Sequence, residues 1–220
     1  MSPKAVFGLF FTLLIQEQVC EAGKAFGGVG GPGGFGPFGG FGNIALINQQ
    51  RQKIVLAQRD VTAAINATNT TIQNDINTAQ TSIDQEVLAA QNKAQTVQAQ
   101  ECVDQHNTAL SQVNSESVKA CDQADQFTNL ENQVTVLSSY HSRLSLIYPM
   151  CAFGGSATCV TDFLTPIDTE VTELQTSILE NVAQVGNDAA KCVQDATTAA
   201  HNAIVAANNA LDECVKSSSA

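Results

Sequence analysis

The sequence of 220 residues contains no tryptophan, two tyrosines and few basic residues, with ten Lys plus Arg against twenty-one Asp plus Glu. The formal net charge is therefore −11. A chain without basic patches cannot neutralise a phosphate backbone, which argues against nucleic acid as a partner. The same charge disfavours docking to anionic lipid, and the shortage of aromatic residues argues against a base-stacking platform. Gln, Asn, Thr and Ser must supply most of the polar surface.

Long apolar runs are also missing, apart from a short one near the N-terminus. Lys4 precedes an apolar stretch at residues 5–15, and a polar stretch then leads to Cys20, Ala22 and Gly23. This pattern is typical of a signal peptide with small residues at its cleavage site, and the run is shorter than the roughly 20 residues of a membrane span. We predict that residues 1–22 are a signal peptide, in preference to an N-terminal core helix. The mature chain would start at Gly23 and contain no membrane span.

Seven cysteines are present, and cleavage after Ala22 would remove one of them, Cys20. The remaining even number predicts three disulfides in an oxidising compartment. The six cysteines are Cys102, Cys121, Cys151, Cys159, Cys192 and Cys214. Two sequons, Asn66-Ala-Thr and Asn69-Thr-Thr, make Asn66 and Asn69 candidate glycosylation sites of a secreted glycoprotein.

Residues 23–42 contain eleven of the fifteen glycines, interspersed with phenylalanines. Such a segment buries too little apolar surface to offset the entropy of ordering its backbone, so we predict a disordered tail. The simpler interpretation is a flexible leader. The alternative is an adhesive segment in which the phenylalanines make weak multivalent contacts.

Residues 43–148 contain neither glycine nor proline, and apolar residues recur there at steps of 3, 4 or 7. This spacing predicts amphipathic helices packed on one another. A single helix of this length would extend about 160 Å, so we favour a bend near residues 104–108. The helical pattern should end at Tyr148, because the residue before Pro149 is disfavoured in the α region. The predicted core positions are Ile47, Ile54, Val61, Ile65, Ile72, Ile76, Ala79, Ile83, Val87, Ala90, Ala94 and Val97, followed by Ala124, Phe127, Leu130, Val134, Leu137, Tyr140, Leu144 and Ile147.

Residues 149–165 read as a connection, after which Thr165 can cap a new helix with Pro166 at its first position. Its apolar stripe then continues to Cys214 in steps of 3 or 4. The second half of this stripe is mostly alanine, which suits close approach of a neighbouring helix. The predicted stripe is Ile167, Val171, Leu174, Ile178, Val182, Val185, Ala189, Cys192, Ala196, Ala199, Ala203, Ala207, Ala210 and Cys214.

These patterns predict an all-α domain over residues 43–216, built either as an antiparallel helical hairpin or as a three-helix coiled-coil-like bundle. If the chain reverses within residues 149–165, antiparallel partners have residue numbers with a nearly constant sum. That condition selects three nested disulfides: Cys151–Cys159, Cys121–Cys192 and Cys102–Cys214. On one continuous helix, however, Cys102 and Cys121 would point about 100° apart. This mismatch is a second reason to expect a bend beside Cys102.

We find no pattern that carries chemistry. No HExxH, GxSxG or Walker sequence occurs, and the glycine-rich segment lacks the strand that precedes a dinucleotide-binding loop. Cys102 and His106 stand at i and i+4, but a paired cysteine supplies no thiolate for a metal. The sequence therefore predicts no catalytic residue, no metal site, no cofactor and no enzymatic activity.

The cysteine layout of residues 102–214 resembles the TsetseEP-domain family of secreted arthropod proteins. The resemblance rests on Glu101-Cys102, Ala120-Cys121, the central pair Cys151 and Cys159, Lys191-Cys192 and Leu211-Asp-Glu-Cys214-Val, and it covers about half of the chain. It implies a helical, disulfide-linked, secreted domain, and it brings no catalytic residues with it.

Three functions fit these observations. The favoured one is a structural or interaction protein of an extracellular fluid or matrix, with other extracellular proteins or further copies of itself as partners. The second is a carrier of apolar ligands in which amphipathic helices open around lipid, although disulfides between helices would resist that opening. The third is a secreted immune or toxin-like effector, which only the extracellular location and the glycine-rich leader support.

Overall fold

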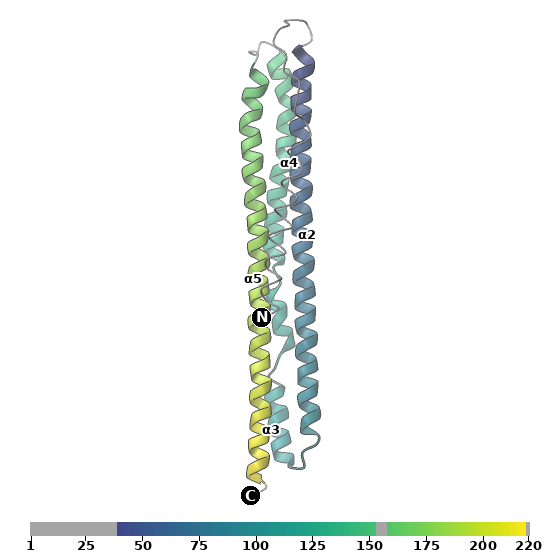
Figure 1. The fold of residues 1–220 in the computed structure, drawn as a ribbon, viewed down its shortest axis with the longest axis vertical. Coiled ribbons are helices and arrows are strands. Elements are labelled where there is room, and N and C mark those ends of the chain that lie inside the picture. Colours follow the sequence, from purple (N-terminus) through teal and green to yellow (C-terminus); the bar gives the residue numbers. More distant parts are fainter. Residues whose placement is uncertain (1–38, 153–157, 219–220) are drawn as a thin grey trace, which may run out of the picture. The chain divides into compact units, whose positions relative to one another are not determined.

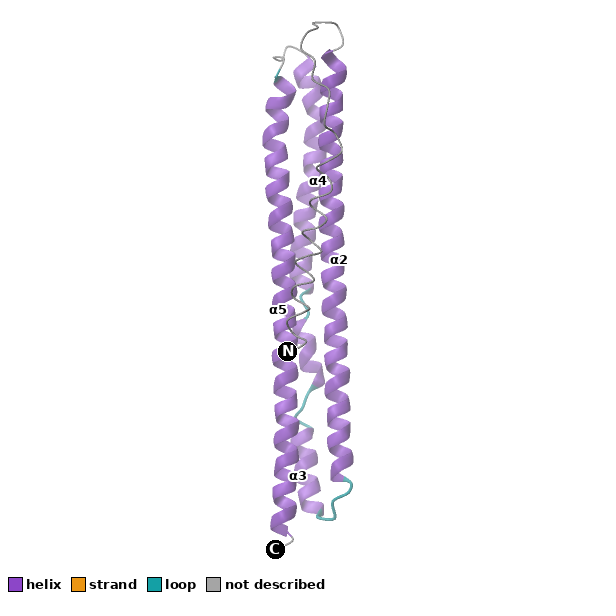
Figure 2. Ribbon diagram, viewed as in Figure 1, coloured by secondary structure: helices purple, strands orange, loops and turns teal. Residues whose placement is uncertain are grey.

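A computed structural model describes residues 39–152 and 158–218, and every regular element in these two ranges is helical (Figures 1 and 2). The predicted all-α class is thus confirmed. The elements are α2 (Gly39–Ala94), α3 (Gln100–Leu110), the 3₁₀ helix η1 (Ser115–Cys121), α4 (Ala124–Ala152) and α5 (Cys159–Ser218). The predicted signal peptide, its cleavage site before Gly23 and the segment 23–38 lie outside the described residues.

The helix α2 begins four residues earlier than the sequence predicts, at Gly39 instead of residue 43. The predicted disorder of residues 23–42 is therefore wrong for residues 39–42. Three of these four residues are glycine, and each disfavours a helix by roughly 1 kcal/mol relative to alanine, which is why the local pattern places the start of the helix later.

The breaks between α2 and α4 do not lie where the sequence predicts a bend. Residues 104–108 are inside α3, and the chain leaves the helical path at residues 95–99 and again at 111–114. Thr96 donates its hydroxyl to the Lys93 carbonyl (2.8 Å), and the Asn114 side chain accepts from the Glu116 amide (2.9 Å). These local side-chain bonds satisfy backbone groups that the helix no longer pairs. Polar residues of this kind can therefore mark the end of one helix, as Thr96 does after α2, or the start of the next, as Asn114 does before η1, without glycine or proline.

The predicted connection at residues 149–165 is too long. The helix α4 continues through Pro149 to Ala152, and α5 starts at Cys159 with Pro166 inside it. Thr165 does not cap a helix; its hydroxyl donates to the Thr161 carbonyl (2.9 Å), as in a helix interior. The extra turns of α5 bury Val160 and Leu164, and burial of such side chains offsets the cost of about 3 kcal/mol of a proline in a helix.

Side-chain contacts fix the direction in which α2 and α5 pass each other. Bonds between them join residues whose numbers differ by 118, 115 and 119, from the first part of α2 to its end. A nearly constant difference is the register of two parallel helices. The contacts of α2 with α4 and η1 follow the opposite rule. In the pairs Arg51–Ser145 and Gln80–Glu116 the two residue numbers have the same sum. A constant sum is the register of antiparallel segments, so α4 runs antiparallel to α2.

The main core draws its buried side chains from α2, α4 and α5 together. Ile54, Leu137 and Ile178, one from each helix, are fully buried. Nearly all predicted core positions of α2 and α4 are buried or half-buried, and the exception is Ala124, which is exposed.

The predicted alanine stripe at the end of α5 is right at Ala207, which is buried, but wrong at Ala199, Ala203 and Ala210, which are exposed. The other inward positions belong to Ala200, Ile204 and Leu211. Turning the helix so that isoleucine and leucine face inward removes more apolar area from water than an alanine face would.

None of the helices in the described ranges contains an apolar stretch long enough to cross a membrane.

Candidate functional site

Three disulfides join the end of α4, η1 and α3 to α5. The inner disulfide is Cys151–Cys159, the middle one is Cys121–Cys192 and the outer one is Cys102–Cys214. Their Cα–Cα distances are 5.7, 5.6 and 5.7 Å, all within the usual range for a disulfide. The pairs are the nested ones that the constant-sum argument selects. They tie α5 to the rest of the chain at its start, its middle and its end.

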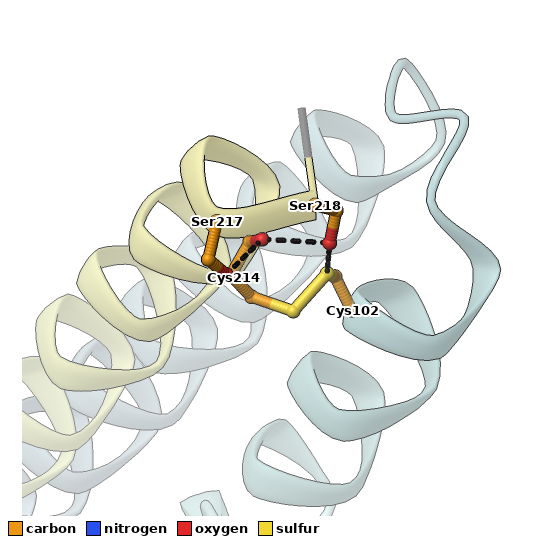
Figure 3. Close-up of a disulfide and its surroundings, with 4 residues drawn as sticks. All are labelled: Cys102, Cys214, Ser217 and Ser218. Carbon is orange, nitrogen blue, oxygen red and sulfur yellow. Dashed lines mark hydrogen bonds between the residues drawn. A yellow bond between two sulfur atoms is a disulfide. The ribbon is translucent and has the colours of Figure 1, made fainter. Parts of the chain in front are cut away.

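The outer disulfide lies in a small apolar cluster of its own with Ala94 and Leu211. Figure 3 shows how the last turn of α5 covers it. The hydroxyls of Ser217 and Ser218 both donate to the Cys214 carbonyl, at 2.8 and 2.9 Å, and the Ser218 Oγ lies 3.5 Å from Cys102 Sγ. This arrangement shields the sulfurs and fixes the end of α5 against α3.

A break in the helical path explains why Cys102 and Cys121 can both face α5. The two cysteines are not on one helix, because Cys102 belongs to α3 and Cys121 ends η1. Because the helix is interrupted at residues 111–114, the direction of the Cys121 side chain is not fixed by the helical rotation that starts at Cys102. The expected 100° mismatch is thus removed by a break in the helix, although not by a bend at residues 104–108.

His106 is the one histidine that the described ranges bury, with 2% of its surface exposed. One turn from the outer disulfide, its Nε2 lies 3.0 Å from Asn208 Oδ1, while its buried Nδ1 has no hydrogen-bond partner within the described residues. Cys102, at i−4, is held in the disulfide. The histidine thus contacts an amide on α5 and forms no cysteine–histidine metal pair.

A polar cluster joins α2 to the first part of α5. Lys53 Nζ lies 3.0 Å from Asp168 Oδ1, and the buried Gln50 donates to the same oxygen at 3.0 Å. Burial raises the pKa of Asp168, but the hydrogen bonds from Lys53 and Gln50 and the charge of Lys53 outweigh it and hold that pKa below its ordinary value. Asp168 is therefore a charged inter-helix contact.

Tyr140 and Arg143 of α4 meet Glu170 of α5 beside that cluster. Arg143 donates to Glu170 at 3.1 Å, and its guanidinium carbon lies 5.1 Å from the centre of the Tyr140 ring. Burial and the neighbouring Glu170 carboxylate raise the pKa of Tyr140. The phenol therefore stays protonated, which suits a packing role at the helix interface.

The two candidate glycosylation sites lie in α2, and both Asn66 and Asn69 are exposed. The hydroxyl residues of their sequons differ, since Thr71 is exposed while Thr68 is 7% exposed and packs toward α5. A Cβ atom added to Gly186 would lie 3.1 Å from Thr68 Cγ2. Thr68 thus has a packing role that is independent of glycosylation, and glycans on either asparagine would project from the outer face of α2.

A groove of about 600 Å³ lies between the first part of α4 and α5, and amide side chains dominate its walls. Leu130 and Val185 are the apolar residues that line it. Its polar lining does not resemble the mainly apolar walls of pockets that take lipids or drug-like ligands. The residues that line it are Gln123, Gln126, Asn129, Leu130, Gln133, Asn181, Gln184, Val185 and Asp188.

Within residues 39–152 and 158–218, no group of three His, Cys, Asp or Glu side chains is placed to hold a metal ion. The main features of the described ranges are the three disulfides, the polar contacts between helices and the two exposed asparagines. No family model, curated protein or solved structure matches the chain significantly.

Proposed function

We propose that the protein is a secreted, non-enzymatic structural or interaction protein of an extracellular fluid or matrix, such as haemolymph, a gut lumen, a gland secretion or a covering layer. The observation that carries this proposal is the spacing of the disulfides along α5. They attach it at Cys159, Cys192 and Cys214, which spans nearly the whole of a helix of 60 residues. Such cross-links persist in oxidising extracellular compartments.

The register of the contacts supports an elongated three-helix bundle as the form of the domain. In this arrangement α2 and α5 run parallel, and α3, η1 and α4 return antiparallel between the end of α2 and the start of α5. The helix α5 alone extends about 90 Å. A long, cross-linked body of this kind suits a protein that spans or spaces other molecules. We also propose that the chain belongs to a TsetseEP-like family. The support is the cysteine layout, whose six cysteines form the three disulfides.

Transport of lipid is less well supported. A carrier would have to separate its helices, and the three disulfides oppose the separation of α3, η1 and α4 from α5. The main core is filled by interdigitated side chains such as Ile54 and Leu137, and the groove beside α4 is lined by amides. An immune or toxin-like role has no feature of the described residues in its favour.

The experiment is expression of the full chain in an insect secretory system, followed by analysis of the protein in the medium. We expect N-terminal sequencing to start at Gly23 and native mass spectrometry to show no bound lipid. Asn66→Gln and Asn69→Gln variants, each compared before and after glycosidase treatment, report which sequon carries glycan. Retention of Met1 or Cys20 would contradict secretion, and stoichiometric lipid would favour the carrier.

A further inference from the structure

Exposed apolar side chains gather at one end of the described domain. Of the eleven large apolar residues that are exposed, nine fall in residues 43–60, 136–152 and 159–178, and the other two are Leu88 and Val205. We call these three ranges together the apolar end. Its exposed residues are Ile44, Leu46, Val55, Leu56, Val136, Leu146, Tyr148, Met150 and Phe163.

The three ranges belong to the same end because contacts join them pairwise. Lys53 of α2 bonds to Asp168 of α5, Arg51 of α2 bonds to Ser145 of α4, and the inner disulfide joins the end of α4 to the start of α5. The exposed apolar residues therefore lie along the same end of the domain, although up to about 120 positions separate them in sequence.

Charge is distributed in the opposite way. The apolar end contains five acidic and four basic residues, a net charge of −1, whereas residues 61–135 and 179–218 contain fourteen acidic and four basic residues, a net charge of −10. Most of the negative charge of the described domain therefore lies away from its exposed apolar side chains.

We propose that the apolar end is a self-association surface that binds the same end of a second copy of this chain. Contact anywhere else brings two strongly acidic surfaces together, which long-range repulsion opposes. Contact at the apolar end buries apolar surface between two nearly neutral ends and leaves the acidic parts of the copies far apart. A pairing of like ends is the self-complementary arrangement of a two-fold dimer. This inference rests on the proposed role as an interaction protein and names one partner for it.

The test is the dimer dissociation constant of the full mature chain, measured by sedimentation equilibrium. Leu146 and Met150, which are 61% and 57% exposed and stand one turn apart on α4, are replaced in Leu146→Gln/Met150→Gln. The matched control is Leu88→Gln/Val205→Gln, which removes two exposed apolar residues outside the apolar end. We expect the first variant to raise the dissociation constant at least tenfold with unchanged helical circular dichroism, and the control to change it less than twofold.

Small-angle X-ray scattering of the same samples tests the geometry. End-to-end pairing should nearly double the maximum dimension of the monomer, whereas side-by-side pairing would leave it almost unchanged. A wild-type chain that stays monomeric at about 100 μM, equal effects of the two variants, or a side-by-side dimer would each overturn the proposal. The proposal would also be overturned if the wild-type chain formed no dimers but floated with phosphatidylcholine vesicles, and if the Leu146→Gln/Met150→Gln variant lost this vesicle binding. A secreted, lipid-free monomer would refute this surface and leave the proposed function intact.

Discussion

Removal of the outer disulfide should lower the stability of the domain more than removal of the inner one. The perturbation is Cys102→Ala/Cys214→Ala, with alanine chosen because Cys102 is 2% exposed and a serine hydroxyl there would be buried without an assured partner. The comparison is Cys151→Ala/Cys159→Ala. Both variants retain the middle disulfide.

The magnitude follows from the loops that each disulfide closes in the unfolded chain. Residues 102 and 214 are 112 positions apart, which by itself would give about 5 kcal/mol in the chain-entropy model. The middle disulfide already joins residues 121 and 192, however, so the outer one closes only the segments 102–121 and 192–214. A loop of about forty residues gives about 4 kcal/mol, and the inner loop, with its cysteines 8 positions apart, gives about 2.5 kcal/mol.

The assay is guanidinium unfolding followed by circular dichroism at 222 nm without reductant. We expect the outer variant to lose about 1.5 kcal/mol more than the inner variant, on the loop arithmetic above. Its denaturant dependence should also steepen, because the unfolded chain becomes more expanded. An inner variant that loses as much stability as the outer one would refute the account through loop closure.

Two further predictions concern contacts between α2 and α5. Gly186→Ala gains about 1 kcal/mol of helix propensity but brings a Cβ atom to 3.1 Å from Thr68 Cγ2, so we expect no net stabilisation in the wild type. In a Thr68→Ser background, which lacks that methyl group, the same change should stabilise the domain by about 1 kcal/mol in urea unfolding. A full gain already present in the wild type would show that the contact is not tight. The contacts of Asp168 with Lys53 and Gln50 lower its pKa, so the stability that Asp168 contributes should be present above about pH 4 and lost as the pH falls below that. Thermal unfolding from pH 6 to pH 2.5 should therefore show a smaller loss of stability on acidification in Asp168→Asn than in the wild type. The difference should be no more than about 1 kcal/mol for so exposed a pair, and parallel pH curves would exclude this role.

Some features of the fold follow directly from the sequence. The apolar repeat of α2 identifies its inward face because isoleucine and valine recur there at helical spacing with amides between them. The disulfide pairs follow from arithmetic because nested partners on antiparallel segments keep a constant sum. Both inferences use regularity over long distances, so an error of one or two residues at a helix end does not disturb them.

Helix ends were predicted less well, because they depend on contacts that no local pattern contains. Pro149 and Pro166 look like boundaries by local rules, yet both lie inside helices because Ile147, Val160 and Leu164 continue the buried face around them. The breaks around α3 have the opposite cause, since Thr96 bonds to the backbone at the end of α2 and Asn114 caps the start of η1.

The gathering of exposed apolar residues could not be read from the sequence at all, because it depends on three segments that only the fold brings together. Leu146 and Leu137 are the same residue type on the same helix, yet Leu146 is 61% exposed and Leu137 is fully buried. The helical repeat assigns Leu146 to the outer face, where a single leucine needs no explanation. The fold places the starts of α2 and α5 beside the part of α4 that contains Leu146. Only this arrangement shows that exposed apolar residues are frequent at this end of the domain and that acidic residues are few. The repeat of a helix therefore predicts what the domain buries within itself, whereas the surface it offers to a partner is a property of the assembled helices.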